Sequence, residues 1–258
     1  MAKPPELARV CNANLVTLGV LYYNDPAPLR LHFGIWAQYP ASVQSRFEFV
    51  VIDDGSSEHM QAHNVLAQLH RLGRVPLSLS ILRVLPPKLA WNIGGGRNLL
   101  MHRASGCWVI IADLDYAVPP KLAAAVLPTV LDPAISPTRV FKFMRDWQPK
   151  GRPQLHPAFA MMRRDLYWQA GGCDEDFVGH YGWTDPHTWF RLGHHRPRVT
   201  ITVNRSWPAI HYLRAGANRT SQSKDKEENA NLYRRKTSGA ANWSNVYLRF
   251  KWMSIKDV

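Results

Sequence analysis

Two carboxylates, Asp113 and Asp115, follow an apolar run at Trp108–Ala112 that is typical of a buried strand. Residues two apart on a strand lie on the same side, so these two negative charges repel unless a cation or a proton lies between them. Mg²⁺ and Mn²⁺ prefer oxygen ligands of this kind. The same spacing recurs at Asp174 and Asp176, so the alternative is a pair of solvated aspartates in a turn.

Polar residues also follow the two earlier apolar runs. Tyr23-Asn24 closes the run at 15–23, and Asp53-Asp54 comes directly after the run at 47–52. In α/β sheets, ligands bind beyond the carboxyl ends of the strands. Three polar clusters at such ends therefore predict one binding site. Ordinary turn chemistry at all three is the alternative.

Strand and helix patterns alternate along the chain, which favours an α/β fold with a mostly parallel sheet flanked by helices. The patterns predict strands at 15–23, 47–52, 76–85, 108–112, 140–144, 158–162 and 199–203, and helices at 28–39, 58–72, 91–104 and from about 185. A polar stretch at 217–228 is predicted to be mobile.

Composition indicates one domain, or one domain with a tail: 258 residues, 46% of them hydrophobic and 20% charged. No apolar run reaches the roughly 18–20 residues of a membrane span, and the N-terminus has no clean secretory region. Cys11, Cys107 and Cys173 are odd in number and scattered. They predict a reduced compartment without a disulfide framework, and so a cytoplasmic protein.

Positive charge is concentrated towards the C-terminus. Residues 186–258 hold 14 Lys and Arg against 4 Asp and Glu, a net charge of +10 out of +13. The last part, 214–258, is basic and aromatic and is set apart as a C-terminal extension. Such a region suits nucleic acid, an anionic membrane surface or an anionic substrate. A merely solubilising surface is the alternative.

Four motifs occur in a specific order: VVIDDGSS at 50–57, WNIGGGRNLL at 91–100, ADLD at 112–115 and GGCDEDFVGHYGWTD at 171–185. Together they make the chain resemble family 2 glycosyltransferases of the GT-A fold, which invert the anomeric centre of a nucleotide-sugar donor. The resemblance spans about 15–213. It implies a nucleotide-binding half at about 15–120, an acceptor-binding half at about 121–213, and the extension after residue 213.

The resemblance implies metal-dependent transfer of a sugar from a nucleoside-diphosphate sugar, with a UDP-sugar favoured. The acceptor would be a hydroxyl on a glycan, a lipid-linked sugar or a protein. The basic extension would allow peripheral contact with an anionic membrane, and no nucleic acid is expected as a partner.

The resemblance also implies nucleotide contacts. Asp53 and Asp54 would meet the base and ribose, with Asp54 accepting from a uracil N–H. Thr17 and Tyr22 would lie on the base-binding first strand. Arg97 would lie against the nucleotide, with the preceding glycines permitting close backbone approach.

The same resemblance implies a metal site for Mn²⁺ or Mg²⁺. Asp115 would be the direct ligand, and Asp113 the ribose contact or second member of the pair. His211 would supply a third ligand, because it follows the catalytic helix and precedes a polar loop. A structural role for a lone histidine is the alternative.

Asp185 is the candidate general base, at the start of a helix after Gly182-Trp183. Family members carry Glu-Asp there, whereas Thr184 replaces the first acid in this chain. A helix cap is the alternative role for Asp185. Asp174 and Glu175, with Trp183 as a sugar platform, are expected on the acceptor side. One acid of the 174–176 cluster is the alternative base.

Two rival functions remain open on the sequence. A sugar nucleotidyltransferase would place its glycine-rich loop after the first strand, whereas the glycines here are at 94–96. A non-catalytic protein would use the basic extension on nucleic acid, by base stacking, or on a membrane surface.

Overall fold

The computed structural model describes residues 10–70, 76, 78–146, 154–213 and 224–255. The strands are β1 (Asn12–Tyr22), β2 (Phe47–Asp53), β3 (Leu79–Val84), β4 (Gly106–Ala112), β5 (Tyr116–Ala117), β6 (Arg139–Arg145), β7 (Gln154–Arg163), β8 (Thr200–Val203), β9 (His211–Tyr212) and β10 (Trp252–Ile255). The α-helices are α1 (Pro26–Trp36), α2 (Ala41–Gln44), α3 (Ala62–His70), α4 (Ile93–Arg103), α5 (Pro120–Leu131), α6 (Arg164–Gln169), α7 (Thr184–His194) and α8 (Glu227–Thr237). The short 3₁₀ helices are η1 (Glu58–Met60) and η2 (Glu175–Phe177).

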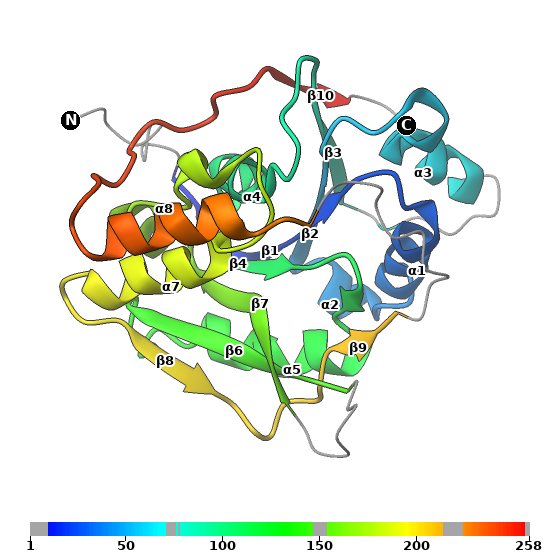
Figure 1. Cartoon of the computed structure of the whole chain (residues 1–258). Coiled ribbons are helices and arrows are strands. Elements are labelled where there is room, and N and C mark those ends of the chain that lie inside the picture. Colours follow the sequence, from blue (N-terminus) through cyan, green and yellow to red (C-terminus); the bar gives the residue numbers. More distant parts are fainter. Residues whose placement is uncertain (1–9, 71–75, 77, 147–153, 214–223, 256–258) are drawn as a thin grey trace.

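One large sheet organises the described residues, in the order β10-β3-β2-β1-β4-β7-β6-β8 (Figure 1). The central strands β3, β2, β1 and β4 are parallel, while β10 and β7 run antiparallel to their neighbours. Parallel central strands are covered on both faces and read as continuous apolar runs. This confirms the predicted α/β fold with a mostly parallel sheet, and the predicted strands all form, with shifted ends.

Helices cover both faces of the sheet and enclose two apolar cores. Trp36 of α1, Val65 of α3 and Val126 of α5 pack on one face. Leu100 of α4 and Leu192 of α7 pack on the other. Alternate residues of β1 point to opposite faces, so a single strand contributes to both cores.

The glycines at the start of α4 allow the helix to pack closely against other parts of the protein. A Cβ on Gly19 of β1 would lie 2.2 Å from Leu100 Cδ1, and one on Gly96 would lie 2.7 Å from Leu21 Cδ2. A Cβ on Gly94 would meet Thr184 Cγ2 at 3.4 Å. The absence of side chains at these positions therefore lets α4 lie close to β1 and to the start of α7.

The prediction that the cysteines form no disulfide was wrong. Cys11 and Cys107 form a disulfide that joins the chain before β1 to the second residue of β4, while Cys173 is a buried free thiol. The two partners are 96 positions apart in the sequence but meet because β1 and β4 are neighbouring strands. Disulfides persist in oxidising compartments, so this bond argues against the expected reducing cytoplasm.

The C-terminal extension, as far as it is described, packs on the rest of the fold. Helix α8 lies over α7, and β10 adds an antiparallel strand beside β3 (Figure 1). The sequence patterns predicted neither element. The mobile stretch expected at 217–228 lies largely outside the described residues. Among the described helices, none has the length and apolar character needed to cross a membrane.

Candidate active site

The candidate site lies at one edge of the sheet, where three neighbouring parallel strands end. Tyr22 at the end of β1 is paired with Asp53 at the end of β2, and Val20 is paired with Ala112 at the end of β4. The polar clusters after these strands therefore lie at the same edge, as the sequence predicted. The starts of α4 and α7 lie here as well, because Asn92, just before α4, donates to Asp54 and Asp185 of α7 pairs with Arg97 of α4.

Asp113 and Asp115 follow β4 and lie together with His156 of β7. One potential ligand atom from each lies within 4.8 Å of the others. Desolvation, followed by the nearby charge of Asp113, raises the pKa of Asp115 to about 6. Two carboxylates that repel each other in this way can be held together by a divalent cation, which prefers oxygen ligands.

His156 is a member of this cluster that the sequence did not single out. Its Nδ1 accepts hydrogen bonds from the backbone N–H groups of Ala158 and Phe159, at 3.2 and 3.0 Å. Burial lowers its pKa, which favours the neutral ring. With Nδ1 an acceptor, the proton is on Nε2, which lies 3.7 Å from Asp113 Oδ2. A protonated Nε2 is a donor, so the aspartates fit a metal better than His156 does.

Arg97 of α4 joins the paired aspartates to the candidate base. Its guanidinium forms ion pairs with Asp113, at 3.3 Å, and with Asp185 at the start of α7. Burial disfavours the charge, but the two carboxylates raise the pKa of Arg97 above its ordinary value. The structure therefore joins Asp113 and Asp185 through one buried cation, and Asp115 lies beside Asp113.

Lys142 of β6 is a second cation that the sequence did not indicate. Its ammonium group donates to the carbonyl of Pro157 and lies 4.1 Å from the ring centroid of Trp189. Trp189 lines a small cavity together with Arg97 and Asp185. Burial lowers the pKa of Lys142 to about 8, although the charge of Asp185 opposes this shift. The residue is far from every motif in sequence, so only the tertiary fold reveals it.

Asp53 and Asp54 occur at the expected edge but have different environments. Both oxygens of Asp53 are occupied by backbone donors, Ser56 N and Ala62 N, each at 2.8 Å. Its side chain is fully buried and organises the loop after β2. Asp54 accepts from Lys88 Nζ and from the Asn92 amide, each at 3.0 Å, and burial raises its pKa. Asp54 therefore pairs with side chains, whereas Asp53 pairs with the backbone.

Thr17 lies in the middle of β1, whereas Tyr22 is its last residue. The hydroxyl of Thr17 donates to Glu48 at 2.6 Å and accepts from Gly106 N at 3.0 Å. Thr17 lies five positions before Tyr22 on the strand, a distance of about 16 Å along β1. Thr17 is therefore not brought to the site. Tyr22 is at the correct edge, with its hydroxyl donating to the Met60 carbonyl and its own carbonyl accepting from Asp54 N.

His211 does not join the paired aspartates. It lies on β9, paired with Ala117 of β5, and its side chain is 59% exposed. Its Nδ1 is 2.5 Å from Asp146 Oδ2. The β5–β9 pairing brings Leu213 N, rather than the histidine, to the carbonyl of Asp115, at 2.9 Å. The expected third metal ligand is therefore corrected to a surface ion pair.

Asp174 and Glu175, which were expected on the acceptor side, are paired with other parts of the protein. Asp174 accepts from Lys236 Nζ at 2.8 Å and from Ser244 N at 3.0 Å. Glu175 accepts from Asn98 Nδ2 of α4 at 2.8 Å, and also from backbone N–H groups of the extension at 248 and 249. Both are buried. Their charges hold the C-terminal extension to the rest of the fold.

Trp183 has a left-handed backbone with φ of 65° and is the residue before α7. Its ring packs on Tyr233 of α8, with centroids 4.8 Å apart. This contact replaces the expected open platform for a sugar.

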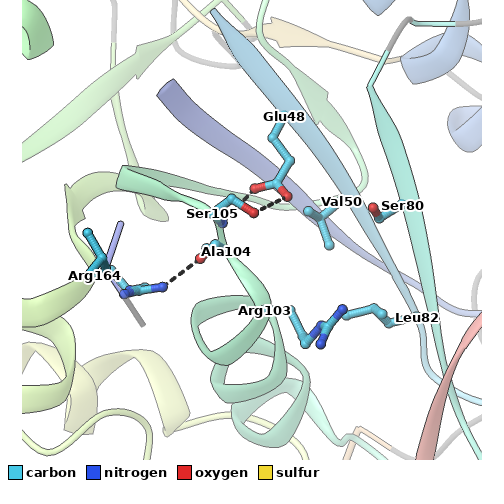
Figure 2. A pocket seen from close by; sticks show the side chains of 9 residues that line it. Glu48, Val50, Ser80, Leu82, Arg103, Ala104, Ser105 and Arg164 are labelled. Carbon is cyan, nitrogen blue, oxygen red and sulfur yellow. Dashed lines mark hydrogen bonds between the residues drawn. The ribbon is translucent and has the colours of Figure 1, made fainter. Parts of the chain in front are cut away.

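A separate cavity of about 400 Å³ lies at the other edge of the sheet, where β2 and β3 begin. Figure 2 shows Glu48 with Arg103 and Arg164 among its lining side chains, and Glu48 hydrogen-bonded to Ser105. None of the paired aspartates or Asp185 lines it. The cavity is therefore distinct from the candidate site.

Comparison with known proteins agrees with this geometry. The family model described as glycosyl transferase family 2 matches residues 37–180, more than half of the chain. The fold and the site thus define a glycosyltransferase. The chain belongs to glycosyl transferase family 2. No curated protein sequence matches it.

Solved structures share the fold at low sequence identity. Staphylococcus aureus TarS 1–349 in complex with UDP-GlcNAc is 16% identical, with a TM-score of 0.61, over 90% of this chain and 68% of that one. The mannosyltransferase PcManGT from Pyrobaculum calidifontis, with GDP-Man and Mn²⁺, is 19% identical, with a TM-score of 0.50, over 79% and 62%. The catalytic domain of Drosophila β1,4-galactosyltransferase 7, with xylobiose, is 10% identical, with a TM-score of 0.51, over 84% and 78%. In another structure of TarS 1–349, the part that matches this chain makes up 60% of the TarS chain.

Proposed function

We propose that this chain transfers a sugar from a nucleoside-diphosphate sugar, with a UDP-sugar favoured, to a hydroxyl acceptor, and that the anomeric centre inverts. The observation that carries the proposal is that Arg97 pairs with both Asp113 and Asp185, while Asp115 lies beside Asp113. The solved relatives that contain UDP-GlcNAc or GDP-Man with Mn²⁺ support the donor class.

Transfer requires stabilisation of the negative charge that develops on the leaving diphosphate. Asp115, with Asp113 beside it, would hold Mn²⁺ or Mg²⁺, which supplies this stabilisation when bound. The Arg97 guanidinium adds positive charge to the same region and keeps the Asp113 and Asp185 carboxylates in fixed positions.

Inversion requires a base on the acceptor side of the sugar. Asp185 would take the proton of the acceptor hydroxyl as that oxygen attacks the anomeric carbon. Its carboxylate is about one-third exposed, with one oxygen paired to Arg97. The start of α7 places it at a positive helix end, which favours the ionised form.

Two substitutions separate the proposed roles. Asp115→Asn and Asp185→Asn should each reduce transfer by at least about 100-fold, the size expected for loss of a charge-stabilising or proton-accepting group. Only Asp115→Asn should also weaken binding of Mn²⁺ with UDP, measured by calorimetry. Near-normal turnover in Asp185→Asn would show that the base assignment is wrong.

A binding experiment tests the donor class independently of turnover. Mn²⁺ with UDP should raise the melting temperature of the wild-type protein, because a ligand that binds only the folded state stabilises it. A screen for slow hydrolysis of donor sugars would then identify the sugar. Stabilisation by nucleic acid, with none by Mn²⁺ and UDP, would favour a non-catalytic binding protein.

The acceptor is proposed only as a hydroxyl on a glycan, a lipid-linked sugar or a protein. Peripheral contact of the basic extension with an anionic membrane also stays a prediction. Sedimentation with vesicles containing phosphatidylserine, at low and high salt, checks it, because attraction to an anionic surface is screened by salt.

A further inference from the structure

The C-terminal extension holds together the two helices that carry Arg97 and Asp185. Helix α4 carries Arg97 and helix α7 begins at Thr184, next to Asp185, yet the two residues are 88 positions apart in the sequence. The described part of the extension contacts both helices, or the loops that lead to them, through buried polar groups. These contacts suggest that the extension acts on the candidate site.

Asn229 of α8 contacts the loop that precedes α7. Its side-chain amide nitrogen lies 3.0 Å from the carbonyl oxygen of Phe177, 2.9 Å from that of His180 and 2.8 Å from that of Gly182. An amide has two N–H groups, so three carbonyls share them. Asn229 is 1% exposed, so these contacts lie in the interior of the protein.

The loop that Asn229 holds leads directly into α7. Gly182 has a positive φ of 83° and Trp183 one of 65°. Positive φ is unfavourable for a residue with a side chain such as Trp183, so surrounding contacts must hold it there. The Asn229 hydrogen bonds and the packing of Tyr233 on the Trp183 ring supply such contacts. They fix the direction in which α7, and with it Asp185, begins.

Two further contacts keep α8 and the following segment in place. Lys236, at the other end of α8, is buried between Asp174 and Asp176, with its ammonium 2.8 and 2.7 Å from their oxygens. Glu175, between these aspartates, accepts from the extension backbone and from Asn98, the residue after Arg97. The acids expected to bind an acceptor thus join the extension to α4.

We infer that Asn229 is a positioning residue for catalysis: it holds the 177–183 loop so that Asp185 lies against Arg97 at the reacting centre. This inference rests on the proposed function, in which Asp185 is the base. None of the described hydrogen bonds of Asn229 is to Asp113, Asp115 or Asp185. Its effect should therefore be on the rate of the chemical step and not on donor binding.

The experiment compares Asn229→Ala with Asn231→Ala in the full chain. Asn231 is on the same helix but is exposed, so the second variant controls for loss of an asparagine from α8. Steady-state transfer should show kcat reduced at least about tenfold in Asn229→Ala, with the KM for the donor within about twofold of wild type. Loss of an interaction that acts only in the transition state lowers kcat and kcat/KM equally and leaves KM unchanged. Asn231→Ala should retain wild-type values.

Hydrogen exchange separates this inference from the proposed function. Asn229→Ala should accelerate amide exchange in 177–183, while exchange in the central strands β1 and β4 stays slow. If the wild type transfers no sugar from any donor, the proposed function fails, and the exchange data still report whether Asn229 holds the loop. Unchanged exchange in 177–183 would overturn the inference in either case.

A second variant covers the outcome in which Asn229→Ala does not fold. Tyr233→Leu removes the ring packed on Trp183 but leaves the buried ion pairs of α8 in place. Tyr233→Leu should also lower kcat, while Mn²⁺ with UDP should still raise the melting temperature of this variant as it does for the wild type. Wild-type kcat in a folded Asn229→Ala, or in Tyr233→Leu when Asn229→Ala does not fold, would contradict the inference.

Discussion

At the scale of single residues, Arg97 organises the candidate site. Its guanidinium pairs with Asp113 after β4 and with Asp185 at the start of α7, two carboxylates 72 positions apart in the sequence. A planar guanidinium presents donors in several directions, so it can bridge two acids that come from different parts of the fold. The sequence indicated all three residues, but only the fold shows that one of them joins the other two.

His156 offers a test of which residues hold a metal. Its Nδ1 accepts two backbone hydrogen bonds, so its Nε2 carries the proton and is a poorer ligand in this arrangement than the two aspartates. We expect His156→Gln to change the affinity for Mn²⁺, measured by calorimetry in the presence of UDP, by less than about threefold. Asp115→Asn should weaken it by at least about tenfold, within the range known for changes close to a metal. Equal losses in the two variants would make His156 a ligand.

At the scale of elements, the acidic loop at 174–176 and helix α8 form one structural unit. Lys236 and Asp174 have side chains only 1% and 0% exposed, and the ammonium also donates to the carbonyl of Asn242. Burial by itself would raise the pKa of Asp176. Hydrogen bonds from Lys236 and Arg249 outweigh this effect and keep the pKa of Asp176 below its ordinary value. Buried charges of this kind are stable only when paired.

Removing Lys236 should therefore be costly. Lys236→Ala leaves the buried Asp174 carboxylate without its cation, and we expect the free energy of unfolding to fall by about 3–5 kcal/mol. Urea denaturation, followed by tryptophan fluorescence, measures this change. Arg235→Ala, at the exposed neighbouring position, should change it by no more than about 0.5 kcal/mol. A similar small change in both variants would mean that the ion pair is not buried in solution.

At the scale of the whole molecule, the sheet brings distant segments together. The extension supplies β10 at one end of the sheet, and the Cys11–Cys107 disulfide joins the chain before β1 to β4 in its centre. The strand order 3-2-1-4 in the parallel part places the ends of β2, β1 and β4 side by side. The site is built where these three strands end.

The disulfide should contribute measurably to stability. It closes a loop of 96 positions, and cross-links of this kind typically stabilise a fold by about 2–4 kcal/mol, mainly by restricting the unfolded chain. We expect dithiothreitol to lower the urea midpoint of the wild-type protein. The double variant Cys11→Ser with Cys107→Ser should have the lower midpoint with or without reductant. Three reactive thiols in the denatured, unreduced protein would show that the bond does not form.

The sequence by itself determined the type of fold and the acids at the strand ends. Apolar periodicity and turn residues are local signals, so they located the central strands, the start of α7 and the pair Asp113 and Asp115. The helix-start signal at Asp185 was local as well, whereas its role as a base was implied by the family resemblance. Local signals did not predict α8 or β10, because a polar helix and a short edge strand are stabilised by what they pack against.

Tertiary structure decided which of the candidate residues meet. It placed Asp174 and Glu175 under the extension and His211 on the surface, and it brought His156 and Lys142 to the site. Contacts of this kind depend on strand order and on helix packing between segments far apart in the chain. Residue type and spacing establish what a side chain can do, whereas its partners, burial and charge environment exist only once the sheet has formed.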